Sequence, residues 1–307
     1  MIQPGEARLL LGSPIAAEIR ASVQVEVAQF KELHGYPPAL AVVIVGADAP
    51  SAVYLQQILR GCRSAGIEGR LVEIPGQATA MQLRRRLIEL NDDPLVSGII
   101  VQMPLPKAIP LSTVTDTIDP AKDVDGIHPL NAGRLLLGHP GFVPTTAQAA
   151  VELLKRSGIK LSGQQVVVIG RSNVVGWPAA ILLTREDATV TICHSRTPDL
   201  AARVAAADVV VVAAGKPGLV TGTMIKPGAT VVDVGINMVD RGEAGHVLVG
   251  DVDFDSARLV AGAITPVPGG VGPVTNALLM THVLQAARAQ AGAARSTSAL
   301  TAGVNRP

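Results

Sequence analysis

The chain has 307 residues, of which 48% are hydrophobic, 17% charged and only 2% aromatic, and its formal net charge is +1. This length and apolar content predict two domains, each with its own buried core. A near-neutral charge and so few aromatic side chains argue against nucleic-acid binding through a basic patch or by base stacking.

Other simple features also narrow the class of protein. The first eight residues are polar and no apolar run reaches the roughly 18 residues that a membrane span needs. We therefore expect a cytoplasmic protein with no membrane partner. The two cysteines, Cys62 and Cys193, have no metal-ligand spacing, so we expect neither a metal site nor a disulfide framework.

The first 110 residues alternate predicted helices and strands. Apolar residues spaced by three and four predict helices, whereas apolar runs closed by glycine or proline predict buried parallel strands. The expected helices cover 14–33, 51–65 and 80–90, and the expected strands cover 38–46, 70–74 and 96–101. This alternation predicts an N-terminal α/β domain with three layers.

Residues 110–145 are rich in proline, aspartate, glycine and histidine and lack a long periodic run, which favours an interdomain segment lining a cleft. A second α/β alternation follows. Its expected elements are a helix over 146–157, strands over 166–169, 190–193, 209–213 and 231–234, a short strand near 259–263, and a final helix over 276–291. The expected domains are 1–145, with helix 276–291 packing back on it, and 146–275, a Rossmann-type domain; the Ala/Ser/Thr tail 292–307 is expected to be disordered.

The second alternation begins with a stretch that predicts a nucleotide site, Val166–Leu183. Its valine-rich strand ends at Gly170, and a helix is expected to begin near Pro178. A strand, a glycine turn and a helix N-terminus together bind the pyrophosphate of a dinucleotide. The spacing departs from G-x-G-x-x-G, because Ser172 replaces the second glycine and Gly176 follows four residues later.

The end of the next strand indicates which dinucleotide is bound. In this fold an NAD enzyme usually has a carboxylate there for the ribose hydroxyls. Here the strand is followed by HSRT at 194–197, and Arg171 lies in the glycine turn. Donors and positive charge suit the 2′-phosphate of NADP. The alternative is that Arg171 and Arg196 are solvated loop residues.

Taken together, the motifs resemble those of the methylenetetrahydrofolate dehydrogenase/methenyltetrahydrofolate cyclohydrolase family, the bifunctional FolD-type enzymes of one-carbon metabolism. The resemblance extends from about Leu9 to Leu284, and the order of the motifs makes it specific. The motifs are VQMPLP (101–106), KDVDG (122–126), GRSNVVGWP (170–178), CHSRT (193–197), GKPG (215–218), KPGATVVDVGIN (226–237), GDVDF (250–254) and TPVPGGVGPVT (265–275).

The resemblance implies a homodimer that binds folate in a cleft between two domains and transfers a hydride to NADP. It implies catalytic and folate-binding roles for Tyr54, Gln102 and Asp125. The other residues implied to bind folate are Pro268, Gly269 and Gly270. Those implied to bind the cofactor are Gly170, Arg171, Ser172, Val175, Gly176, His194, Ser195, Arg196, Gly215, Ile236 and Thr275.

Two of these assignments have structural alternatives. Tyr54 could be a packing aromatic on its helix. Asp123, two residues before the expected pterin-binding carboxylate of Asp125, is either a ligand group or a turn residue.

The chain departs from the family pattern at two places. Ile58 occupies the position of the family lysine four residues after the tyrosine, and Pro-Thr-Thr-Ala at 144–147 replaces Pro-Cys-Thr-Pro. Because isoleucine has no exchangeable proton, we expect a dehydrogenase with weak or absent cyclohydrolase activity. The alternatives are a fully bifunctional enzyme, a non-catalytic folate- or NADP-binding paralogue, and an amino-acid or shikimate-type dehydrogenase.

Overall fold

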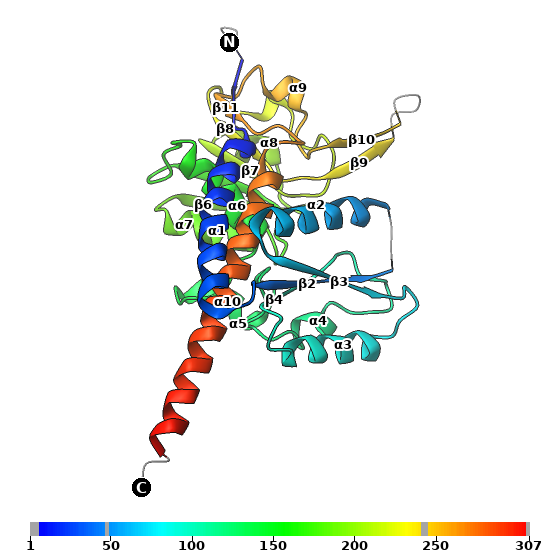
Figure 1. The fold of residues 1–307 in the computed structure, drawn as a ribbon. Helices are drawn as coiled ribbons and strands as arrows, with labels where there is room; N and C mark the ends of the chain where they lie inside the picture. Colours follow the sequence, from blue (N-terminus) through cyan, green and yellow to red (C-terminus); the bar gives the residue numbers. More distant parts are fainter. Residues whose placement is uncertain (1–5, 47–48, 241–244, 305–307) are drawn as a thin grey trace. The chain divides into compact units, whose positions relative to one another are not determined.

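The computed structural model describes residues 6–46, 49–240 and 245–304, with side chains for 6–46, 55–240 and 245–293. The chain forms two compact units, each assembled from separate segments (Figure 1). We call them the six-stranded unit, Met1–Ala17 with Pro144–Thr275, and the three-stranded unit, Glu18–Val143 with Asn276–Pro307. The expected N-terminal domain differs in its first 17 residues, which belong to the six-stranded unit because Arg8–Leu9 pairs with Ala263–Ile264.

The three-stranded unit contains a parallel sheet in the order β3-β2-β4. Its strands are β2 (Ala39–Val45), β3 (Glu68–Ile74) and β4 (Gly98–Val101). All seven residues of β2 are buried, as expected of the central strand of a covered sheet. Helix α2 (Ala49–Ala65) covers one face of this sheet, and α3 (Ala80–Asp92) with α4 (Ser112–Thr115) covers the other (Figure 1).

The layer between this sheet and α3 is an apolar core. Val43 and Val101 contribute from the sheet, and Leu83, Leu87 and Leu90 from the buried stripe of α3. Leu83, Leu87 and Leu90 are spaced by four and three residues, so they share one face of the helix predicted over 80–90. Thr79 and Gln82 form a capping box that begins this helix at the predicted residue.

The six-stranded unit contains an entirely parallel sheet in the order β1-β11-β8-β7-β5-β6. Its strands are β1 (Arg8–Leu9), β5 (Gln165–Ile169), β6 (Thr189–Cys193), β7 (Val209–Val212), β8 (Thr230–Asp233) and β11 (Ala263–Ile264). The strand order reverses between β5 and β7, so the carboxyl end of β5 is the point at which doubly wound sheets bind ligands.

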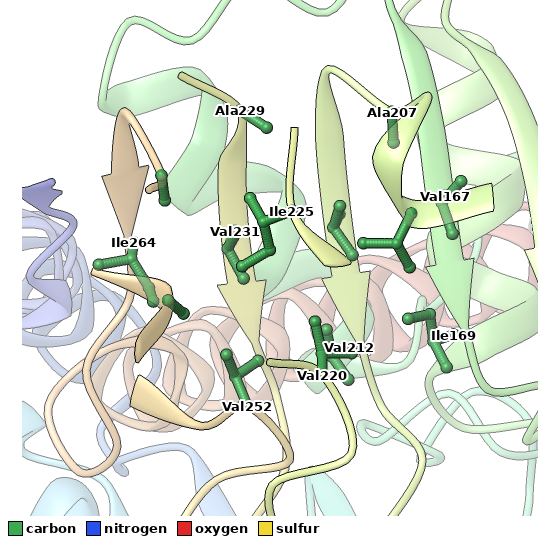
Figure 2. Close-up of a cluster of buried hydrophobic side chains, with 14 of the residues drawn as sticks. Val167, Ile169, Ala207, Val212, Val220, Ile225, Ala229, Val231, Val252 and Ile264 are labelled. Atoms are coloured by element: carbon green, nitrogen blue, oxygen red, sulfur yellow. The ribbon is translucent and has the colours of Figure 1, made fainter. Parts of the chain in front are cut away.

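The core of this unit lies against one face of the sheet. Figure 2 shows Val167, Val212, Val231 and Ile264 from four strands packed with Val220 and Val252 from the connecting segments. The strands consist largely of valine because β-branched side chains pack well on a sheet that is covered.

The remaining elements complete the two units. They are α1 (Gly12–His34), α5 (Pro129–Leu137), α6 (Thr145–Arg156), α7 (Gly176–Arg185), α8 (Leu200–Ala205), η1 (Gly222–Met224), β9 (Asn237–Asp240), β10 (His246–Val249), α9 (Phe254–Ala257) and α10 (Val271–Val304). Strands β9 and β10 form an antiparallel pair that the sequence analysis did not predict. No helix in the described part of the chain combines the length and apolar character of a membrane span.

Three predicted elements differ from the observed ones. The strand expected near 259–263 lies at Ala263–Ile264, because the preceding residues form a turn after α9. The segment 110–145 contains two helices, α4 and α5, where no periodic run was found. The final helix, α10, begins at Val271 and continues to Val304, so the tail predicted to be disordered is helical up to that residue. Its alanine content explains this length, since alanine has the highest helix propensity.

Candidate active site

The glycine turn after β5 needs glycine at two positions for steric reasons. Gly170 has φ +123°, and a Cβ there would lie 2.1 Å from the carbonyl oxygen of Ala213. A Cβ on Gly176 would lie 2.3 Å from the carbonyl oxygen of Gly170. The turn therefore packs so tightly that neither glycine could carry a side chain without moving backbone.

Ser172 stabilises this turn. Its hydroxyl oxygen accepts a hydrogen bond from the backbone N–H of Val175 at 3.1 Å, and Gly176 N lies 3.5 Å away. Serine thus organises backbone groups where the usual motif has a second glycine. Among the residues that the structure describes, the N–H groups of 171–174 in the same turn have no acceptor, and free N–H groups of this kind before a helix can bind a pyrophosphate.

The loop after β6 is also preorganised. His194 N donates to Thr197 Oγ1 at 2.9 Å, and Arg196 N donates to His194 Nδ1 at 3.2 Å. These local bonds leave the side chains of Ser195 and Arg196 exposed, and Arg171 is exposed as well. Among the residues that the structure describes, neither guanidinium forms an ion pair, so both remain available to an anionic ligand.

The loop that follows β7 contains Gly215, which has φ +64°. The carboxylate of Asp251, fully buried, accepts hydrogen bonds from the backbone N–H groups of Ala214, Gly215 and Lys216 at 2.6 to 2.8 Å. The sequence analysis missed this aspartate. It lies within the GDVDF motif, and its distance of 35 residues from the loop left no local signal.

A second buried aspartate, Asp233 at the end of β8, holds the segment that carries Asp251. Its carboxylate accepts from the N–H groups of Gly235, Asp251 and Val252 at 2.8 to 3.0 Å. Burial raises the pKa of Asp233 to about 6, and the nearby carboxylate of Asp251 adds to the increase.

The remaining predicted residues of this unit lie on its loops and on the start of α10. Ile236 is 64% exposed, so its side chain is accessible to a ligand, whereas Thr275 is buried and donates its hydroxyl to the carbonyl of Val271. The carbonyl of Gly269 accepts from Gly12 N at 2.9 Å. Pro268 and Gly270, the other two residues implied to bind folate, lie in the same loop, directly before α10.

In the three-stranded unit, the structure places Gln102 and Asp125 near one end of the sheet. Gln102 directly follows β4 and is 5% exposed. A parallel β-bridge joins Ile99 to Asp123, so the segment leading to Asp125 runs beside β4 toward its carboxyl end. Asp125 is half-buried. Ligand groups in parallel sheets gather at this end.

Asp123 is a turn residue, which decides between the two roles left open by the sequence. Its buried carboxylate accepts from Ile127 N at 3.1 Å, His128 N at 2.8 Å and Asn131 Nδ2 at 2.8 Å. Burial raises its pKa, and these three donors oppose that increase. The carboxylate is thereby committed to closing the turn that contains Asp125.

His282 supports the same turn from α10. It is 5% exposed, and its Nδ1 lies 2.8 Å from the carbonyl oxygen of Val124, the neighbour of Asp125. Burial lowers the pKa of His282, which favours the neutral ring and hence a donating Nδ1–H. A histidine within an apolar helix gave no sequence signal for this role.

Tyr54 lies on α2, and its side chain is outside the described part of the structure. Ile58, one helical turn later, is completely buried. The position of the family lysine is thus occupied by an apolar core residue. The lysine of the KDVDG motif, Lys122, donates its Nζ to the carbonyls of Leu90 and Asp93 at 3.1 and 2.6 Å. Lys122 is therefore engaged in the structure and is no evident substitute.

The two cysteines offer no nucleophile. Both are buried and free, and burial raises the pKa of Cys62 to about 12. The thiolate that nucleophilic chemistry needs is therefore disfavoured at neutral pH.

Fold and geometry together define the class: a two-unit α/β protein with one Rossmann-type unit for a dinucleotide. Two family models match it. Residues 10–125 match the catalytic domain of tetrahydrofolate dehydrogenase/cyclohydrolase, and residues 144–291 match the NAD(P)-binding domain of the same family. The chain belongs to the tetrahydrofolate dehydrogenase/cyclohydrolase family.

Similar proteins are known along almost the whole chain. The bifunctional protein FolD of Parvibaculum lavamentivorans is 49% identical and that of Chloroflexus aurantiacus 45%; the alignments cover 94% and 93% of this chain and 98% and 99% of theirs. The crystal structure of the Trypanosoma brucei methylenetetrahydrofolate dehydrogenase-cyclohydrolase, complexed with NADP and an inhibitor, superposes with a TM-score of 0.89 at 41% identity. That superposition covers 93% of this chain and 99% of the other.

Proposed function

We propose that this protein oxidises 5,10-methylenetetrahydrofolate to 5,10-methenyltetrahydrofolate with NADP as the hydride acceptor, in one-carbon metabolism. Family membership over both units supports the reaction class. One observation carries the choice of NADP: β6 is followed by exposed Ser195 and Arg196, and residues 194–197 include no carboxylate of the kind that selects NAD. The exposed guanidinium of Arg171 adds a second cation for a 2′-phosphate.

Each unit has a separate task in this proposal. In the six-stranded unit, the turn from Gly170 to Gly176 brings backbone N–H groups against the pyrophosphate. NADP bound there supplies the hydride acceptor. In the three-stranded unit, the half-buried carboxylate of Asp125 accepts hydrogen bonds from the amino and N–H groups of the pterin, and Gln102 adds an amide. Hydride transfer requires alignment of the two ligands more than it requires a base.

We further propose that cyclohydrolase activity is weak or absent. Addition of water to the methenyl carbon requires proton transfer, and a positioned acid or base contributes about 10²–10⁴-fold to such a step. The fully buried Ile58 supplies neither. The second candidate is a bifunctional enzyme, and the names of the relatives favour it, since those matched along this chain are called bifunctional.

Two assays on the unmodified protein test both proposals. Mixing the protein with NADP and methylenetetrahydrofolate should produce the absorbance of the methenyl product, with NAD much less effective. Supplied methenyltetrahydrofolate should then hydrolyse at the spontaneous rate. If no methenyl product forms, the dehydrogenase proposal is wrong and a non-catalytic role is favoured. Hydrolysis well above background would instead establish the bifunctional enzyme.

The variant Ile58→Lys tests whether this residue is the reason. A lysine at this buried position would have a lowered pKa and could transfer a proton near neutral pH. We expect the variant to gain hydrolysis of at least about tenfold over the native protein. Ile58→Met is the matched control, because methionine is unbranched and similar in length to lysine but has no titratable group. A gain in both variants would show that altered packing, rather than the amine, is responsible.

We also propose a cytoplasmic homodimer. The family resemblance supports both points. Light scattering coupled to size exclusion distinguishes a dimer from a monomer, and a monomeric mass at micromolar concentration would contradict the proposal.

A further inference from the structure

We propose that Asp251 is a positioning residue for cofactor binding, which it would support by holding the loop Ala214–Lys216 in a preformed shape. The inference rests on the proposed use of NADP, and all its contacts lie within the six-stranded unit. The loop directly follows β7, the neighbour of β5 across the switch point of the sheet, and it contains Gly215.

A single side chain makes several hydrogen bonds to this loop. Asp251 Oδ2 accepts from Ala214 N at 2.6 Å and Gly215 N at 2.8 Å, and Oδ1 accepts from Lys216 N at 2.8 Å. Asn237 Nδ2 is a fourth donor, at 2.8 Å from Oδ1. Three consecutive N–H groups converging on one carboxylate form an anion-binding nest, which fixes the backbone of all three residues.

The main chain of the same residue also holds the segment that follows the loop. The main-chain carbonyl of Asp251 accepts from Val220 N at 3.2 Å, and Val220 O accepts from Asp253 N at 2.8 Å. Figure 2 shows Val220 and Val252 in the core beside Val212, the last residue of β7. The loop from Ala214 to Val220 is therefore closed at both ends by the segment around Asp251.

Close steric contacts also fix the position of Asp251. A Cβ on Gly235 would lie 2.3 Å from Asp251 Cγ, and a Cβ on Gly250 would lie 1.9 Å from Asp233 Oδ2. Asp251 thus packs against Gly235, two residues after Asp233, and Asp233 packs against Gly250, the residue before Asp251. Since Asp233 in turn accepts from Asp251 N at 3.0 Å, the position of the second carboxylate is itself fixed.

The chemistry of the carboxylate explains why it acts on the loop rather than on a ligand. Asp251 is fully buried, and its two oxygens are occupied by four N–H donors. Among the residues that the structure describes, it has no cationic partner, so these donors alone compensate the buried charge. A loop held in this way loses little conformational entropy when it meets a cofactor.

The test is the variant Asp251→Asn, which keeps the shape of the side chain but replaces one acceptor oxygen with an NH₂ donor. At least one loop N–H then faces a donor, so the loop should open. We expect the dissociation constant for NADP to rise at least tenfold, with KM for NADP rising more than kcat falls. The only tryptophan, Trp177, is 47% exposed in the first turn of α7, so its fluorescence reports binding without turnover.

Asp208→Asn is the matched control. Asp208 directly precedes β7, and its carboxylate accepts from Gln165 N at 2.9 Å and from Lys226 Nζ at 2.6 Å. Asp208 therefore connects the start of β7 to β5 and to Lys226, whereas the loop Ala214–Lys216 follows the end of β7. We expect NADP binding within twofold of the native value. A purely structural role for Asp251 predicts equal changes in NADP affinity in the two variants when they are equally destabilised, and that result would overturn the proposal.

Hydrogen exchange gives a second readout, which needs no bound cofactor. The amides of Ala214, Gly215 and Lys216 should be protected in the cofactor-free protein, although they lie in a loop, and should lose protection in Asp251→Asn. Rapid exchange in the native protein would overturn the proposal. If Asp251→Asn does not fold, Asn237→Ala removes one donor and leaves the carboxylate, and it should weaken NADP binding about threefold; unchanged binding would overturn the proposal.

The outcomes separate this inference from the proposed function. If the native protein binds no NADP, both are wrong. If it binds NADP and Asp251→Asn binds it equally well, only the positioning role is wrong.

Discussion

Individual side chains divide here into those that remain available for a ligand and those committed to the fold. Arg171, Ser195 and Arg196 are exposed at the carboxyl end of β5 and β6, whereas Asp123 and Asp251 have their carboxylates filled by N–H donors. Acidic residues that lie close together in sequence, such as Asp123 and Asp125, therefore have different roles. Only the contacts reveal which carboxylate can still accept from a substrate.

The available cations predict cofactor selectivity. In the variant with Arg171→Ala and Ser195→Asp together, we expect the preference for NADP over NAD to fall, because charge-assisted hydrogen bonds of about 1.5–3 kcal/mol each are lost and a like charge is added. Each such bond corresponds to roughly a tenfold to hundredfold change in kcat/KM for NADP. Steady-state kinetics with both cofactors measures the effect. An unchanged ratio would mean that these residues do not contact the 2′-phosphate.

Asp125 predicts a separate effect on the substrate. Asp125→Ala should weaken folate binding by about tenfold to hundredfold, since a carboxylate that pairs with pterin donors is lost. Affinity for NADP should remain nearly unchanged, because the cofactor contacts lie in the other unit. Calorimetric titration of each ligand measures both. Asp116→Ala, an exposed carboxylate of the same unit, is the control. Equal losses for the two ligands would indicate a folding defect.

At the scale of elements, the groups of the candidate site are positioned by turns rather than by the helices and strands that the turns connect. Gly170 and Gly176 permit a turn in which backbone meets backbone, and Ser172 orders it. In the other unit, Asp123 and His282 hold the turn that carries Asp125. Both turns are preorganised by bonds that involve no ligand, which lowers the entropy cost of binding.

The glycine turn supplies a prediction at this scale. Gly176→Ala places a methyl group against the carbonyl of Gly170, so we expect a loss of about 1–3 kcal/mol in the free energy of unfolding and a large loss of NADP affinity. Gly133→Ala, within α5, is the control, because a Cβ there meets no atom within 4 Å. It should stabilise the protein by up to about 1 kcal/mol. Urea denaturation and Trp177 fluorescence measure the two quantities. Equal behaviour of the two variants would contradict the steric argument.

Across the whole molecule, buried ionisable groups link stability to pH. Burial raises the pKa of Asp233 from 3.8 to about 6. The folded state therefore binds more protons than the unfolded state between about pH 4 and pH 6, and the stabilisation present below pH 4 is lost as the pH rises through 6. Burial also raises the pKa of Asp123, with the same sign, and lowers that of His282, whose contribution is lost as the pH falls.

Asp233→Asn isolates one of these contributions. At about 1.4 kcal/mol for each pKa unit, the free energy of unfolding of the native protein should fall relative to the variant by up to about 3 kcal/mol between pH 4 and pH 7. Urea denaturation of both proteins across this range measures the difference. The comparison cancels the effects of Asp123 and His282, which both proteins share. A difference that is flat, or that grows with pH, would show that Asp233 is already ionised at pH 4.

The sequence by itself determined most of the elements and the family. The helices and parallel strands came from apolar periodicity, because burial of one face acts on residues a few positions apart. The phosphate turn after β5 was equally visible, since its glycines, its serine and the helix start lie within seven residues. Ile58 stood out through the family resemblance, because it occupies the position of the family lysine four residues after Tyr54.

Only the tertiary structure decided which groups far apart in the chain support the site. Residues 1–17 belong to the six-stranded unit because β1 pairs with β11. His282 meets Val124 across 158 positions, and Asp251 meets Lys216 across 35. No local pattern encodes these contacts, because a buried carboxylate or imidazole takes its partner from whatever backbone the fold brings within about 3 Å. The role of each buried polar side chain is therefore set by packing, whereas its presence in the chain shows only that a partner must exist.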